Sequence, residues 1–232
     1  MKKITELKNI HFTQDIWVLC AGASMNYLHP SFFENKIVVG VNAACKFFSC
    51  NYTVAKDGNI FKEIVKIMSS DNKLILSKYE SGNYHQRLNS AEREHYIFEH
   101  SPNMPKCEPD LKCIAFNSDK MVVSHSTVTS ALHIAAYMGA KNIILCGHDC
   151  GTIDRESTIV GYHDNLPDRH LPDADYVRWL GIIENQTAIV ANELNKVYDC
   201  NVCSINPFIN FNLEGHQYIP SNTSGIIQRK LK

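Results

Sequence analysis

The sequence predicts an α/β fold, a doubly wound and mostly parallel Rossmann-like sheet of about six strands with helices on both faces. Three observations lead to this prediction. Short runs of apolar residues alternate with segments of helical spacing. Glycine or polar residues end each run, as at strand-to-turn boundaries. The runs are apolar along their whole length, which is typical of parallel strands that are covered on both faces.

Each predicted strand is a short run rich in valine, isoleucine or leucine. The first ends at the small residues 21–24, the second at Asn42, the third at 56–58 and the fifth at 147–149. The six runs are 16–20, 36–41, 52–55, 73–76, 142–146 and 201–205.

Three segments have the spacing of amphipathic helices, 59–68, 126–139 and 173–198. The second begins at Ser126-Thr127, residue types that cap helix N-termini, and stops at Gly139.

The chain is predicted to form one domain over residues 1–232, because roughly 150 residues is the usual size of a domain. Two segments interrupt the alternation of strands and helices, at about 79–118 and 151–172. The first contains three prolines and a short helical patch at 91–98. We expect both to be irregular insertions near the site, because long loops in compact domains are often functional.

The composition excludes several classes of protein. Lys+Arg is 23 and Asp+Glu is 24, a net charge of −1, so no nucleic-acid partner is expected. The sequence lacks an apolar run long enough to span a membrane, and its N-terminus lacks the apolar core of a secretory signal. We therefore expect a cytoplasmic protein whose 9 cysteines are reduced. A zinc site at 146–150 or 200–203 is the less favoured interpretation, because these cysteines lie in or beside apolar strands.

Small or polar residues follow several of the predicted strands, and in this fold such strand ends meet at one edge. Glycine lets a backbone approach a ligand closely, and free N–H groups at a helix N-terminus can bind phosphate. The predicted nucleotide-binding residues are Gly22, Ala23, Ser24, Asn42, Asp57, Ser126, Thr127 and Gly147.

Each of these positions also has a simpler explanation. Asn42 and Asp57 are residue types that form turns, and Ser126 and Thr127 could serve only as caps. The sequence contains neither the dinucleotide-binding glycine motif nor a P-loop. Only the recurrence of such residues at several strand ends favours a nucleotide site.

Three residues are candidates for catalysis. Asp149 follows the fifth strand and a glycine, so its carboxylate is expected at the sheet edge, where it could bind Mg²⁺, orient a histidine or cap the next segment. His163 and His170 lie in the second insertion, and an imidazole can act as a general base near neutral pH.

Separated blocks of the sequence resemble bacterial sialyltransferases of glycosyltransferase family 42. The block 18–25 is similar to their first strand and glycine loop, and Gly40-Val-Asn42 to their second strand with its nucleotide-contacting Asn. Asp57 falls near a further binding Asn, and 126–149 resembles their Thr-Ser-Gly helix and Gly-x-Asp strand end. The same pattern occurs in the related family of 6-hydroxymethyl-dihydropterin pyrophosphokinases and motility-associated factors. This chain departs from the pattern at Ala21, Ala23 and Val128, where the family has Asn, Pro and Gly.

The resemblance implies a glycosyltransferase that moves a sialic-acid-like sugar from a CMP-sugar, or another nucleotide-sugar, to a glycan hydroxyl. It implies no metal and no cofactor, with His170 or His163 as the base. One alternative is a pyrophosphokinase that binds Mg²⁺ through Asp149 and Asp57; another is a nucleotide-binding protein without catalysis. Homo-oligomerisation stays open, as does weak contact of the basic C-terminal tail with an anionic membrane.

Overall fold

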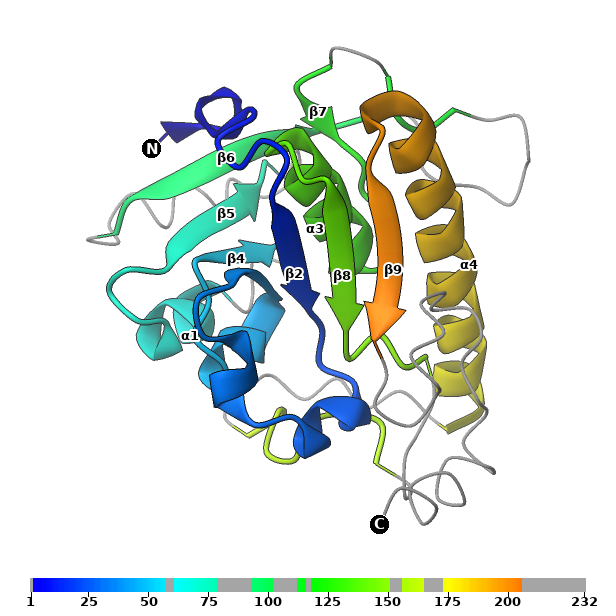
Figure 1. The fold of residues 1–232 in the computed structure, drawn as a ribbon. Coiled ribbons are helices and arrows are strands. Elements are labelled where there is room, and N and C mark those ends of the chain that lie inside the picture. The colour runs from blue at the N-terminus through cyan, green and yellow to red at the C-terminus, as the bar shows by residue number, and fades with distance from the viewer. Residues whose placement is uncertain are drawn as a thin grey trace.

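The computed structural model describes residues 2–56, 61–78, 93–101, 112–115, 118–150, 156–164 and 173–205, with only the backbone at 61–62 and 173–177. These residues form one sheet of nine strands in which every pairing between strands is parallel. The sheet is strongly twisted (Figure 1). The strands are β1 (Lys2–Lys3), β2 (Asp15–Leu19), β3 (Ile37–Val41), β4 (Tyr52–Ala55), β5 (Lys73–Ser77), β6 (His95–His100), β7 (Lys120–Met121), β8 (Asn142–Cys146) and β9 (Asn201–Ile205).

The prediction of a mostly parallel α/β sheet is confirmed, but the count of about six strands was too low. All six predicted strands are present, and the structure adds β1, β6 and β7. The largest error concerns β6, where the sequence predicted a helical patch inside an irregular insertion. Only Tyr96–Phe98 are apolar there, too few residues to distinguish a helix from a strand. Pairing with β5, from Leu74–His95 to Ser77–Phe98, makes this segment a strand.

The described helices are α1 (Phe61–Ile67), α3 (Thr127–Tyr137) and α4 (Asp173–Tyr198), together with four short 3-10 helices. Ser126 caps α3, because its side chain accepts a hydrogen bond from the backbone N–H of Val128. The chain leaves α3 at Gly139, whose φ of +92° is readily adopted by glycine. The 3-10 helices are η1 (Ile4–Leu7), η2 (Ala23–Tyr27), η3 (Pro30–Phe33) and η4 (Asn42–Lys46).

The two faces of the sheet are covered by different kinds of structure. Val18 packs in the cluster that contains the buried residues of α3, whereas Leu19 packs in the cluster on the other face. That other face is covered by residues of η2, η3 and η4, and further along the sheet by Ile64 of α1. Figure 1 shows α3 behind the sheet and α4 beside β9 at its edge. Long helices therefore cover one face, and the second is covered by 3-10 helices and one short α-helix.

Both faces of β2 and β8 are buried, which explains their continuous apolar sequences. Val18, Leu19, Leu145 and Cys146 are each 2% exposed or less. Cys146 packs as a small apolar side chain in the core, and the eight cysteines of the described residues are free thiols. The described helices include none with the length and apolar character needed to cross a bilayer.

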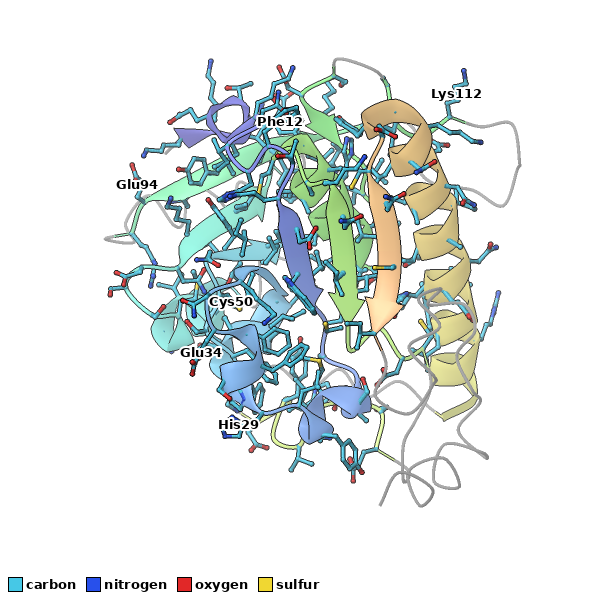
Figure 2. The ribbon with its side chains drawn as sticks, in the orientation of Figure 1. Phe12, His29, Glu34, Cys50, Glu94 and Lys112 are labelled. Carbon is cyan, nitrogen blue, oxygen red and sulfur yellow. The ribbon has the colours of Figure 1, made fainter. Side chains whose placement is uncertain are left out.

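The strand order places a topological switch between β2 and β8. Along the sheet the order is β1-β6-β5-β4-β3-β2-β8-β9, and the ninth strand, β7, pairs with β6 outside this order. From β2 the chain proceeds to β3 on one side, and from β8 to β9 on the other. Ligands of open parallel sheets bind beyond the carboxyl ends of the strands at such a point. In Figure 2 this is the end of the sheet where His29 lies, whereas Phe12 lies at the opposite end.

Candidate functional site

The loops after β2 and β8 are held together at the switch point. The N–H of Cys20 donates to the carbonyl of Cys146 at 2.8 Å, and the N–H of Gly22 donates to the carbonyl of Gly147, also at 2.8 Å. These bonds continue the ladder beyond the ends of both strands. The two loops therefore form one continuous floor at the carboxyl edge of the sheet.

Both glycines of this floor are required by close contacts. A Cβ at Gly22 would lie 2.4 Å from the carbonyl oxygen of Gly147 and 2.6 Å from Oδ2 of Asp149. Gly147 has a φ of +69°, and a Cβ there would lie 2.4 Å from Cγ of Met25. The sequence predicted that glycine lets the backbone approach a ligand. In the structure the closest approach is that of one loop to the other.

A buried hydrogen-bonded pair joins the same two loops through side chains. The N–H of Ser24 donates to Oδ2 of Asp149 at 2.7 Å, and its hydroxyl donates to Oδ1 at 2.6 Å. Ser24 is 0% exposed and Asp149 3%. Burial raises the pKa of the Asp149 carboxyl above its ordinary value, and the two hydrogen bonds from Ser24 act in the opposite direction. Asp149 thus orients the glycine loop after β2.

A pocket of about 170 Å³ opens above this floor, between the two loops, the start of α3 and one face of α4. Its polar lining comes from the backbone of the glycine loops, from Asp149 and from the hydroxyl-bearing residues at the start of α3 and in the 156–164 segment. Its apolar wall comes mainly from α4. The lining residues are Ala21, Gly22, Ser126, Val128, Gly147, His148, Asp149, Cys150, Ser157, Thr158, Leu180 and Ile183.

The segment 156–164 crosses the carboxyl edge and closes one side of the pocket. Thr158 forms an antiparallel bridge with Gly22, and the N–H of Ile159 donates to the carbonyl of Ala21 at 2.8 Å. Lys46 holds the far end of the segment, donating from Nζ to the carbonyl of Gly161 at 2.7 Å. This part of the second insertion is therefore docked on the sheet by specific contacts.

The predicted site residues fall into four groups. Those that line the pocket are Gly22, Ser126, Gly147 and Asp149. Those buried directly behind it are Ala23, Ser24 and Thr127, at 1%, 0% and 3% exposure. Those elsewhere at the carboxyl edge are Asn42 and His163. Asp57 and His170 lie outside the described residues.

Asn42 follows β3 in a conformation that asparagine tolerates better than most residues, with a φ of +53°. Its Oδ1 is buried and has no hydrogen-bond partner among the described residues. A buried polar atom without a partner is costly, so the site favours a donor there, from a ligand or from water.

His163 is exposed, and its ring packs edge-on against Tyr162 at 5.2 Å between centroids. Tyr162 in turn stacks with Phe47 at 6.5 Å. The docked segment thus carries His163 at the carboxyl edge, outside the lining of the pocket.

Several pocket residues were not predicted from the sequence. Ser157 and Thr158 lie in a stretch without periodicity, and Leu180 and Ile183 read only as the apolar stripe of a helix. What these residues share is their place in the fold, because the strand order determines which loop and which helix face reach the switch point.

No protein family, curated protein or solved structure matches this chain.

Proposed function

We propose that this chain is a glycosyltransferase that moves a sialic-acid-like sugar from a CMP-sugar, or another nucleotide-sugar, to a glycan hydroxyl. One observation carries the proposal. The described pocket lies at the topological switch, and its lining contains the glycine loops and the start of α3. The same blocks of sequence carry the resemblance to family 42 sialyltransferases.

The pocket is smaller than the roughly 300–1,000 Å³ of typical ligand sites, so it would hold only part of such a donor. We assign it to the anionic centre of the donor, near the hydroxyl of Ser126. That hydroxyl accepts a hydrogen bond from Val128 N–H and keeps its own proton for a ligand oxygen. The remainder of the nucleotide would extend over the end of β3, where Oδ1 of Asn42 could accept a hydrogen bond from a base or ribose.

In this proposal a histidine of the second insertion, His163 or His170, removes the proton of the acceptor hydroxyl, and the sugar is displaced from the nucleotide in a single inverting step. Asp149 would act through the loop that it holds, because both of its oxygens accept hydrogen bonds from Ser24. The proposed location is the cytoplasm.

Nucleotide binding is the first expected result. In thermal unfolding of the full chain, CMP or CDP should raise Tm without added metal. Ligand at about 100 times Kd stabilises the folded state by about 2.7 kcal/mol. For a chain of this length that corresponds to a rise of roughly 5 to 11 °C.

UDP, GDP, ATP and ATP with Mg²⁺ are the matched comparisons. A shift produced only by ATP with Mg²⁺ would contradict the transferase and support the pyrophosphokinase. Cytidine nucleotide binding without turnover of a CMP-sugar would support a non-catalytic nucleotide-binding protein.

The base is tested by His163→Ala and His170→Ala, each assayed with a CMP-sugar across pH. Loss of a general base typically lowers turnover by about 10²- to 10⁴-fold. We expect this loss in one of the two variants, together with loss of the acidic limb of the pH profile. His29→Ala, another exposed histidine at the carboxyl end of the sheet (Figure 2), serves as the control. Full turnover in both test variants would rule out this mechanism.

A further inference from the structure

His125 is an exposed histidine whose position is fixed by contacts on several sides. Its backbone carbonyl accepts a hydrogen bond from Nζ of Lys56 at 2.9 Å. Its backbone N–H donates to Oε1 of Gln186 at 3.3 Å, and its ring lies 4.7 Å from that of Trp179. Nδ1 of the ring pairs with Nε2 of Gln186 at 2.9 Å. An exposed side chain held in this way loses little further freedom when a ligand binds.

The contacts with Gln186 determine which ring nitrogen carries the proton. A backbone N–H can only donate, so the atom of Gln186 that faces it must be the carbonyl oxygen. The other end of the amide is therefore the NH₂ group, which donates to Nδ1 of His125. Since Nδ1 accepts, the proton of the neutral imidazole is on Nε2. Among the described residues, none is hydrogen-bonded to that nitrogen.

The same contacts place the ring beside the pocket. Trp179, Ile183 and Gln186 are four and three residues apart in α4, so they share one face of the helix. Ile183 lines the pocket, and so does Ser126, the residue that follows His125. The imidazole contacts Trp179 and Gln186, the two ends of this α4 stripe, and Ile183 between them lines the pocket.

We propose that His125 is a ligand-binding residue whose Nε2–H donates to an anionic phosphate oxygen of the nucleotide, and that Gln186 is a positioning residue that keeps the proton on that nitrogen. This inference rests on the proposed function and extends it to a contact between imidazole and phosphate. A neutral donor of this kind recognises phosphate without a basic surface, in keeping with the net charge of −1.

The test compares the binding of CMP and of cytidine to the full chain by calorimetry. Loss of a hydrogen bond to a charged group should weaken CMP binding about tenfold to hundredfold in His125→Ala. Cytidine has no phosphate, so its affinity should not change. His29→Ala is the control, because it removes an exposed imidazole at the start of η3, on the face of the sheet opposite to α3 and α4.

Gln186→Glu tests the positioning role with little change of shape. Its carboxylate still accepts the N–H of His125 but cannot donate to Nδ1, so at alkaline pH, where the imidazole is neutral, the ring proton should lie on Nδ1. Imidazole ¹⁵N shifts, assigned by their loss in His125→Ala, should show an Nε2–H ring in the wild type and an Nδ1–H ring in Gln186→Glu. CMP affinity should fall in the variant and cytidine affinity should not.

The outcomes separate the inference from the proposed function. If the wild type binds CMP and His125→Ala binds it with the same affinity, only the inference is overturned. Equal losses for CMP and cytidine, or an Nδ1–H ring in the wild type, would also overturn it. A wild-type chain that binds neither CMP nor any other cytidine nucleotide would overturn both.

Discussion

Alanine in place of Gly22 should lower the free energy of unfolding by about 3 kcal/mol, at the upper end of overpacking costs. The added Cβ would lie 2.4 Å from a carbonyl oxygen, that of Gly147, which cannot rotate away as the end of a side chain could. Relief requires the loops after β2 and β8 to separate, which would break the bond between Gly22 N–H and Gly147 and distort the pocket floor. We therefore expect nucleotide binding to be lost together with stability.

Urea unfolding measures this change, as a lower midpoint at unchanged slope. Gly181→Ala is the matched control, because Gly181 is an exposed residue of α4 and an added Cβ there meets nothing within 4 Å. Alanine in a helix is favoured over glycine by about 0.5–1 kcal/mol, so this variant should be more stable than the wild type. Equal stability of the two variants would contradict the close approach at Gly22.

The two substitutions Asp149→Ala and Asp149→Asn should differ sharply. Alanine leaves the buried N–H of Ser24 without an acceptor and should cost about 2 kcal/mol. Asparagine can place its oxygen opposite that N–H and its NH₂ opposite the Ser24 hydroxyl, which can turn to accept. We therefore expect Asp149→Asn to remain within about 1 kcal/mol of the wild type by urea unfolding.

The pH dependence of stability supplies a second readout of Asp149. Its folded-state pKa is raised above the ordinary value of 3.8, chiefly by burial. Between the ordinary and the raised pKa the folded protein binds more protons than the unfolded chain, so this carboxyl lowers stability as pH rises through that window. Asp149→Asn should remove that part of the slope. An identical pH profile in wild type and variant would contradict the raised pKa.

Asp149→Asn also separates a structural role from a catalytic one. If the carboxylate only orients the glycine loop, nucleotide binding and turnover should survive the substitution. Loss of turnover with stability retained would show that its charge takes part in the reaction.

The buried parallel strands were predictable because β2, β3 and β8 are short, almost wholly apolar runs rich in β-branched residues, and glycine or polar residues follow each of them. The strand β6 was not, because its apolar run is short and its identity depends on pairing with β5. The 3-10 helices after β2 and β3 were also missed, since each is only four or five residues long and its apolar residues pack into the tertiary core.

At the site, the expectation that the carboxyl ends of parallel strands meet at one edge placed Gly22, Gly147, Asp149 and the start of α3 together from the sequence alone. It could not pair Ser24 with Asp149, or His125 with Gln186, because those partners are 125 and 61 residues apart in the sequence. Local patterns carry no information about contacts over such separations.

The sequence determined the fold class and the edge of the sheet at which a ligand would bind. It did so through the spacing of its apolar residues and the glycine and polar residues that end each apolar run, because these features depend on local burial. The tertiary structure decided the strand count, the cover on each face and the roles of the polar side chains. Those properties depend on which surfaces of distant segments pack together in the folded chain. Asp149 illustrates the difference: its position after a buried strand was visible in the sequence, but its task of holding Ser24 exists only once β2 and β8 lie side by side.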